Sequence, residues 1–469
     1  MDKNEIFKLI DDNKDLLVNT AKKLWEKPET SLNEEKSSKL QMNILKEEGF
    51  SIEENVGDMP TAFVAEYGNG KPILGVLGEY DALAGMSQKV KANREPIIKG
   101  EPGHGCGHNL LGTAGIGAVL AIKEAIDKGE IEGTIRYYGC PAEETLTGKV
   151  FMARDGVFDD LDSAITWHPM QANSVWSSSS LAMNSVRFNF EGQAAHASSS
   201  PEMGRSALDA VELMNVGANY LREHVNEKAR IHYSITNGGG SPNIVPDAAS
   251  VWYYIRAPKR EEVEEIFERI KKIANGAAMM TETEVDWKFQ AACYDVLANE
   301  KLGEVITSNM KEIGGPNFDK KEKDFAEELA KSFDKGQKKK VMAGAPEEVI
   351  EQSLHGDVIE PYDKGEVMSG STDVGDVSWI TPLAQFTAAT WPVGTAVHTW
   401  QAVAASGSSI GHKAMIFSSK TLAGTLFDLY QDPELIDEAK KEFDEETEGK
   451  DYETPLPENT EPPFDQFDK

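Results

Sequence analysis

A cysteine and two histidines share one short, glycine-rich turn of this sequence, Gly-His-Gly-Cys-Gly-His-Asn at residues 103–109. Cys106 and His108 are two positions apart, so in an extended turn their side chains can point the same way. A thiolate and an imidazole both bind zinc-like divalent ions, which makes this turn a candidate metal site. A buried cysteine flanked by capping histidines would have the same sequence, so the turn alone does not decide the question.

A pair of adjacent carboxylates forms the second candidate, in Cys-Pro-Ala-Glu-Glu at residues 140–144. The pair directly follows an apolar stretch of strand length, and neighbouring carboxylates at such a position are costly unless a cation lies nearby. A metal ion would be that cation, with one carboxylate as its ligand and the other handling protons. A solvated helix start is the alternative, because acidic side chains favour the first turn of a helix.

Three weaker candidates complete the set. Asp81 follows the apolar run 72–77, His168 ends the apolar run 163–167, and His398 lies in Gly-Thr-Ala-Val-His-Thr late in the chain. Most of these groups follow a strand at its carboxyl end, which is where open α/β sheets form their sites. One thiolate, three imidazoles and a carboxylate exceed the needs of one tetrahedral ion, so we predict two divalent ions per subunit, zinc or manganese.

The elements expected around these residues alternate between strands and helices. Amphipathic helices are predicted at 4–27 and 31–48, a helix rich in glycine and alanine at 110–125, and strands at 61–65, 72–77, 133–139 and 163–167. This alternation predicts an α/β fold, with a mixed, mostly parallel sheet flanked by helices in a metal-binding catalytic domain.

A second pattern occupies residues 183–291, where the order strand, helix, strand, strand, helix, strand is typical of a ferredoxin-like (βαββαβ) unit. We therefore predict an inserted dimerisation or lid domain there, between the catalytic segments 1–182 and 292–469. The stretch 320–340 is charged and helical, with no evident catalytic group. The acidic, proline-containing tail 432–469 is predicted to wrap the surface or to be partly mobile.

Composition limits the functions that this chain can have. A length of 469 residues argues for two domains, and a net charge of -31 disfavours nucleic acid as a partner. The sequence has no continuous apolar run of membrane-spanning length and no secretory signal, so no membrane association is expected. Three cysteines are too few for a disulfide framework, which favours a reducing, cytoplasmic setting.

Four motifs together resemble a known family. They are Gly-His-Gly-Cys-Gly-His-Asn (103–109), Pro-Ala-Glu-Glu (141–144), Gly-Gln-Ala-Ala-His-Ala (192–197) and Ser-Thr-Asp-Val-Gly-Asp-Val-Ser (371–378). On these motifs the chain is similar to the di-metal amidohydrolases and aminopeptidases related to aminoacylase and carboxypeptidase, in the branch that contains hippurate and auxin-conjugate hydrolases. Asn109 departs from the pattern, since many relatives of this branch have Asp there.

The resemblance implies roles for individual residues. It implies metal ligands at five positions, with the cysteine thiolate shared by both ions: Cys106, His108, Glu144, His168 and His398. It implies that Glu143 is the general base and that Asp81 orients the metal cluster. It also implies that His196 reaches the active site of the other subunit of a dimer, and that Asn243 and Arg256 bind a substrate carboxylate.

The activity implied is hydrolysis of the amide bond of an N-acyl amino acid, most specifically of p-aminobenzoyl-glutamate to p-aminobenzoate and glutamate. The protein is expected to act as a homodimer or as a heterodimer with a related subunit. Another N-acyl-amino-acid hydrolase or a dipeptidase would use the same residues, and a non-catalytic partner subunit would keep the fold. A zinc-dependent base deaminase is excluded because the spaced Cys-x-x-Cys pair is missing.

Overall fold

The structure is a computed structural model that describes residues 1–464. The chain divides into two compact units. The first contains residues 1–178, 297–366 and 377–452, and the second contains 179–296, 367–376 and the chain from Glu453 onward.

The first unit is built on a seven-stranded sheet with the strand order β1-β2-β4-β3-β5-β11-β6. The strands are β1 (Ser51–Glu54), β2 (Phe63–Asn69), β3 (Ile73–Glu79), β4 (Gly133–Cys140), β5 (Ser163–Met170), β6 (Ser174–Trp176) and β11 (Leu383–Ala389). The four middle strands, β4, β3, β5 and β11, run parallel, whereas the pairings toward both edges are antiparallel. The predicted mixed sheet is therefore confirmed, and its parallel part is the buried centre.

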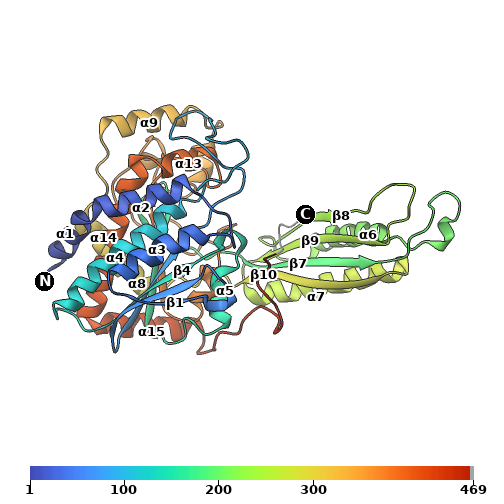
Figure 1. The fold of residues 1–469 in the computed structure, drawn as a ribbon, viewed down its shortest axis with the longest axis horizontal. Helices are drawn as coiled ribbons and strands as arrows, with labels where there is room; N and C mark the ends of the chain where they lie inside the picture. The colour runs from blue at the N-terminus through green and yellow to red at the C-terminus, as the bar shows by residue number, and fades with distance from the viewer. Residues whose placement is uncertain (465–469) are drawn as a thin grey trace. The chain divides into compact units, whose positions relative to one another are not determined.

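The helices of the first unit lie on this sheet or around it (Figure 1). They are α1 (Lys3–Asp12), α2 (Lys14–Glu26), α3 (Glu35–Glu47), α4 (His108–Asp127), α5 (Gly148–Arg154), α8 (Glu300–Ile313), α9 (Lys320–Ala330), α10 (Gln337–Val341), α11 (Glu347–Ile350), α13 (Trp400–Ser406), α14 (Ser409–Gln431) and α15 (Pro433–Glu446). Helix α4 packs on β3, β4 and β5, and α14 packs on α4. The short helix α12 (Val374–Ser378) begins in the second unit and ends in the first.

The glycines of α4 allow it to lie close to the sheet. A Cβ atom at Gly112 would lie 2.6 Å from the carbonyl oxygen of Glu79, so a larger residue would push the helix away from β3. By length and composition α4 could cross a membrane, but 83% of its apolar window is buried inside the fold. That burial is typical of a core helix.

The second unit contains a four-stranded antiparallel sheet in the order β10-β7-β9-β8. Its elements are β7 (Ala182–Glu191), α6 (Ala207–Leu221), β8 (Arg230–Asn237), β9 (Ala248–Ala257), α7 (Arg260–Thr281) and β10 (Glu284–Cys293). Helices α6 and α7 pack on each other and on β7 and β9, so they share one face of the sheet (Figure 1). Val186, Phe188 and Phe190 of β7 are all buried. The predicted ferredoxin-like pattern is confirmed.

Several predicted boundaries differ from the structure. The helix expected at 4–27 is two helices, because the chain breaks at Asn13, whose side chain donates to the carbonyl of Leu9 at 3.1 Å. The charged stretch 320–340 is likewise divided between α9 and α10. The tail differs from its prediction in the first part, because Pro433–Glu446 forms a helix in which Ile436 and Ala439 are buried. The last five residues of that tail lie outside the described residues.

Candidate metal centre

The predicted site residues of the first unit follow the parallel strands at one edge of the sheet. Asp81 lies two residues beyond β3, Glu143 and Glu144 lie in a 3-10 turn just after β4, and His168 lies near the end of β5. Since parallel strands end at a common edge, side chains placed there meet although they are far apart in sequence.

Three groups of side chains at this edge could each hold a metal ion. They are Cys106 with His108 and His168, Cys106 with Glu144 and His398, and Glu79 with His108 and Glu143; the ligand atoms of each group lie within 4.8 Å of one another. The distance from Cys106 Sγ to His168 Nε2 is 3.3 Å, and that from Glu144 Oε2 to His398 Nε2 is 3.1 Å. The structure thus brings all five predicted ligands together, with the thiol common to two groups.

Backbone geometry holds the cysteine turn in place. Gly107 has a φ of 79°, and a Cβ atom there would lie 2.8 Å from the side chain of Pro169. Only glycine adopts this conformation without strain, and it allows α4 to begin at His108. His398 also has a positive φ, 58°, and its N–H donates to the carbonyl of Gly105 at 3.0 Å. The two distant segments are therefore tied together at the site.

Asp81 fixes the orientation of His108. Its Oδ1 lies 2.8 Å from His108 Nδ1, and its Oδ2 accepts from Ser31 Oγ at 2.8 Å and from the backbone N–H of Glu144 at 3.0 Å. Burial would raise the pKa of Asp81, but the His108 charge and these hydrogen bonds hold that pKa below its usual value. With Nδ1 engaged, Nε2 of His108 is left for a metal ion.

A buried ion pair that the sequence did not predict lies beside these ligands. Lys149 Nζ lies 2.6 Å from Glu79 Oε1, and Glu79 Oε2 lies 3.2 Å from His108 Nε2. Glu79 lies two residues before Asp81, after the same apolar run at 72–77, so the sequence offered a signal for it. Lys149 has no such signal, because lysine side chains are almost always exposed.

Glu34 was also not predicted, and it supports the turn that carries Glu143. Its carboxyl group is fully buried and accepts from the backbone N–H groups of Leu32 and Ala142, both at 2.9 Å. Ala142 has a positive φ of 55°, so this hydrogen bond stabilises a strained residue just before Glu143. Burial, and then the charge of Asp81, raises the pKa of Glu34 to about 8.

The donor set fits divalent metal ions. Among the described residues, His108 Nε2 and Glu144 Oε1 are buried without a hydrogen-bond partner, as expected of atoms that bind a cation. Burial, and then the charge of His108, lowers the pKa of His168 to about 4, so this imidazole is in its neutral, metal-binding form at neutral pH. Burial and the charge of Glu144 raise the pKa of the Cys106 thiol well above its usual value. A nearby cation would reverse that shift.

The other three predicted residues lie in the second unit. His196 pairs with Ile244, and the N–H of Ala197 donates to the carbonyl of Asn243 at 3.0 Å, so His196 and Asn243 lie on adjacent segments. His196 Nδ1 accepts from the N–H groups of Ser198 and Ser199, each at 3.2 Å.

Arg256 lies in β9, where its guanidinium stacks over the ring of Tyr254, 5.1 Å from the centroid. Within residues 1–464 its Nε has no hydrogen-bond partner, and no hydrogen bond joins it to His196 or Asn243. The structure therefore places His196 and Asn243 on adjacent segments, whereas Arg256 lies in β9 of the same unit.

Known proteins are similar to this chain in fold and in sequence. Residues 181–280 match the M20 family model of the peptidase dimerisation domain. A dinuclear metal-binding peptidase of the M20 family from Bacillus subtilis has the same fold, with a TM-score of 0.56 at 16% identity over 89% of this chain and 98% of that one. An aminobenzoyl-glutamate utilization protein from Klebsiella pneumoniae has a TM-score of 0.63 at 16% identity over 90% of this chain and 98% of that one.

Sequence similarity is much stronger to one of the subunits of p-aminobenzoyl-glutamate hydrolase from Escherichia coli strain K12. The two chains are 42% identical over 478 aligned positions, which cover 98% of this chain and 99% of the relative. The chain therefore belongs to the M20 family of metal-dependent hydrolases, and it is an amidohydrolase, an enzyme that cleaves amide bonds.

Proposed function

We propose that this amidohydrolase cleaves p-aminobenzoyl-glutamate to p-aminobenzoate and glutamate, with two zinc or manganese ions in each subunit. The observation that supports the chemistry best is the Cys106 thiol, which belongs to two potential ligand groups directly beside Glu143. The substrate is proposed because the relative that is 42% identical is a p-aminobenzoyl-glutamate hydrolase subunit.

Cys106, His108, Glu144, His168 and His398 would hold the ions. Such ions, when bound, supply Lewis-acid chemistry that lowers the pKa of water and polarises the amide carbonyl. Glu143 is only 8% exposed, and its Oε2 lies 3.9 Å from His108 Nε2, at the edge of the ligand set. We assign it the role of general base, which takes a proton from the attacking water and delivers it to the departing amine nitrogen.

We assign residues 183–291 to dimerisation and substrate binding. His196 accepts two backbone hydrogen bonds at Nδ1, so its neutral form carries the proton on Nε2 and can donate to a developing oxyanion. In this proposal His196 comes from the partner protomer, and Asn243 and Arg256 bind the substrate's α-carboxylate. The partner is a second copy or a related chain, since the E. coli relative is itself named as one subunit of its enzyme.

Glu143→Gln tests the catalytic assignment. The variant should bind as much metal as the unaltered protein and lose at least about 100-fold in kcat, the range expected when a general base is removed. Glu53→Gln, which changes an exposed carboxylate on β1, is the control and should leave both quantities unchanged. Near-native turnover by Glu143→Gln would remove Glu143 from this role.

A substrate panel tests the specificity. The purified chain should cleave p-aminobenzoyl-glutamate with a higher kcat/KM than hippurate or dipeptides. A preference for dipeptides would make the chain a dipeptidase, and activity that appears only with a related chain present would support the heterodimer.

A further inference from the structure

A cavity of about 780 Å³ opens beside His398, within the first unit. Its walls come from the loop at 84–102, including Met86, Arg94 and Lys99, and from Trp400 at the start of α13. The His398 side chain is 50% exposed, although its Nε2 lies 3.1 Å from Glu144. His398 therefore belongs both to a potential metal ligand group and to the wall of this cavity.

Two cations in this wall form no ion pair within the described part of the chain. Arg94 and Lys99 are exposed and form no ion pair with any of residues 1–464. The other two basic residues of the loop, Lys89 and Lys91, both pair with Glu95, each at 2.5 Å. In a chain with a net charge of -31, two unpaired cations beside the site create a local positive potential that attracts anions.

The loop that carries these cations is well organised. Gln88 is 1% exposed, and its Nε2 donates to the carbonyls of Lys89 and Asn93, at 3.0 and 2.9 Å. Its Oε1 accepts from the backbone N–H of Glu95 at 2.8 Å, and Leu83 pairs with Gly103 where the loop begins and ends. The backbone on either side of Arg94 is thus held by a buried side chain, which fixes where the Arg94 side chain leaves the loop.

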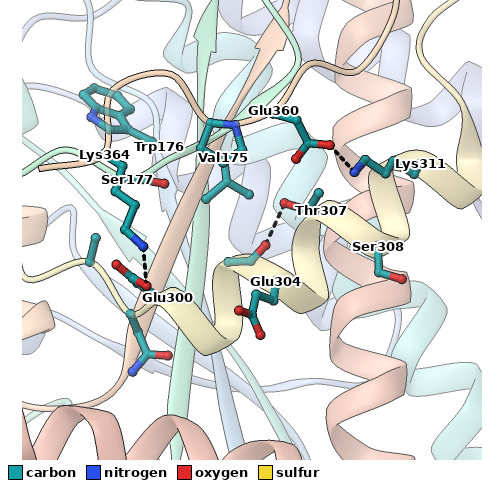
Figure 2. Close-up of a pocket in the computed structure, with 14 residues that line it drawn as sticks. Val175, Trp176, Ser177, Glu300, Glu304, Thr307, Ser308, Lys311, Glu360 and Lys364 are labelled. Atoms are coloured by element: carbon teal, nitrogen blue, oxygen red, sulfur yellow. Dashed lines mark hydrogen bonds and ion pairs between the residues drawn. The ribbon is translucent and has the colours of Figure 1, made fainter.

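A second pocket of the first unit shows the opposite arrangement (Figure 2). It lies along α8, and its cations are already paired: Lys364 Nζ lies 2.8 Å from Glu300, and Lys311 pairs with Glu360. A ligand anion would have to displace these carboxylates. Lys364, whose cation is already paired, provides a matched control for the cavity beside His398.

We propose that the cavity beside His398 binds a carboxylate of the substrate, namely the side-chain carboxylate of its glutamyl group, through Arg94 and Lys99. This assignment rests on the proposed function and adds to it a source of selectivity for acidic amino acids. A substrate whose amide lies at the ligand groups can extend a short side chain past His398 into the cavity. Met86 and Trp400 would then contact its methylene groups, while the guanidinium and the ammonium bind the carboxylate.

The test compares two substrates of the same shape that differ in one charge, p-aminobenzoyl-glutamate and p-aminobenzoyl-glutamine. The double variant Arg94→Gln/Lys99→Gln should raise KM for the glutamate substrate by about 10- to 100-fold, the loss expected for charge-assisted hydrogen bonds. KM for the glutamine substrate should stay within about twofold of its original value. The single variant Arg94→Lys keeps a cation at this position and should therefore retain part of the preference for the glutamate substrate. The control Lys364→Gln should change KM for neither substrate.

Binding is measured separately from turnover, by calorimetry with both compounds on Glu143→Gln and on Glu143→Gln carrying the double substitution. If binding discriminates between the two compounds through Arg94 and Lys99 but the native chain does not cleave them, the cavity assignment stands and the proposed function is wrong. If the native chain cleaves the glutamate substrate and the double variant binds both compounds as the parent does, the cavity assignment is wrong and the proposed function stands.

Discussion

The ammonium of Lys149 lies 2.6 Å from the carboxylate of Glu79, and neither side chain is more than 2% exposed. The other oxygen of that carboxylate lies 3.2 Å from Nε2 of His108. Burial alone would raise the pKa of Glu79, but the charges of Lys149 and His108 lower it. A buried carboxylate is thus kept ionised next to a potential metal ligand by a lysine on α5.

Removing the lysine should destabilise the protein strongly. Lys149→Met leaves the Glu79 charge buried without its ammonium, and we expect a loss of about 3–5 kcal/mol in the free energy of unfolding. The double variant Glu79→Gln/Lys149→Met should lose less than Lys149→Met alone, because the carboxylate that lost its ammonium is then a neutral amide. Urea unfolding of the metal-depleted protein measures both.

The control is Lys8→Met, which breaks an exposed surface pair with Asp12 and should cost under about 1 kcal/mol. Equal losses for the single and double variants would refute this account of the pair.

Asp81 should control metal affinity without binding the metal itself. Asp81→Asn replaces a carboxylate that accepts from His108, Ser31 and the Glu144 N–H with an amide that presents a donor. We expect metal affinity to fall by about 10- to 100-fold, the usual cost of losing the carboxylate behind a ligating histidine. Competition with a chromogenic chelator measures this affinity. Ser31→Ala removes a single hydrogen bond from the same carboxylate and should lower metal affinity clearly less. An effect as large as that of Asp81→Asn would argue against the role of Asp81 in orienting His108.

His412 should make the fold sensitive to acid. Burial, and then the charge of Lys22, lowers its pKa from the usual 6.5 to about 4. The unfolded chain therefore binds a proton more readily than the folded protein between these two pH values, so stability falls as the pH drops from about 6.5 to 4, by up to about 1.4 kcal/mol per pH unit.

The variant His412→Gln should show a shallower loss of stability across that pH range, whatever its stability at neutral pH. Urea unfolding at intervals from pH 7 to pH 4 measures the slope. His224→Gln changes an exposed histidine and should follow the unaltered protein. An unchanged slope in His412→Gln would contradict the prediction.

The sequence indicated that Asp81, Glu144 and His168 lie at one edge of the sheet, because each follows an apolar run and parallel strands end at a common edge. The assignment of Cys106, His108, Glu144, His168 and His398 as ligands came from the family resemblance, since His398 neither ends a predicted strand nor begins a predicted helix. The break at Asn13 was not predictable in the same way, because the apolar stripe continues through both helices and periodicity does not register a single non-helical residue between them.

The supporting residues escaped prediction because their environment is made by distant contacts. Lys149 meets Glu79 across 70 residues, and Glu34 meets Ala142 across 108. A lysine or a glutamate in a helical stretch is ordinarily solvated, so nothing local marks these two as buried. The cavity beside His398 was missed for the same reason, since its walls come from residues 85–100 and 398–401.

X-ray absorption at the zinc edge of the zinc-loaded protein tests the central claim most directly, namely that the Cys106 thiolate is a ligand of the bound metal. The account predicts a sulfur scatterer at about 2.3 Å together with nitrogen and oxygen scatterers near about 2.0–2.1 Å. The sulfur signal should vanish in Cys106→Ser and persist in Cys293→Ser, which changes a buried cysteine of the second unit. Bound zinc without a sulfur ligand, or a sulfur signal that survives in Cys106→Ser, would contradict the account.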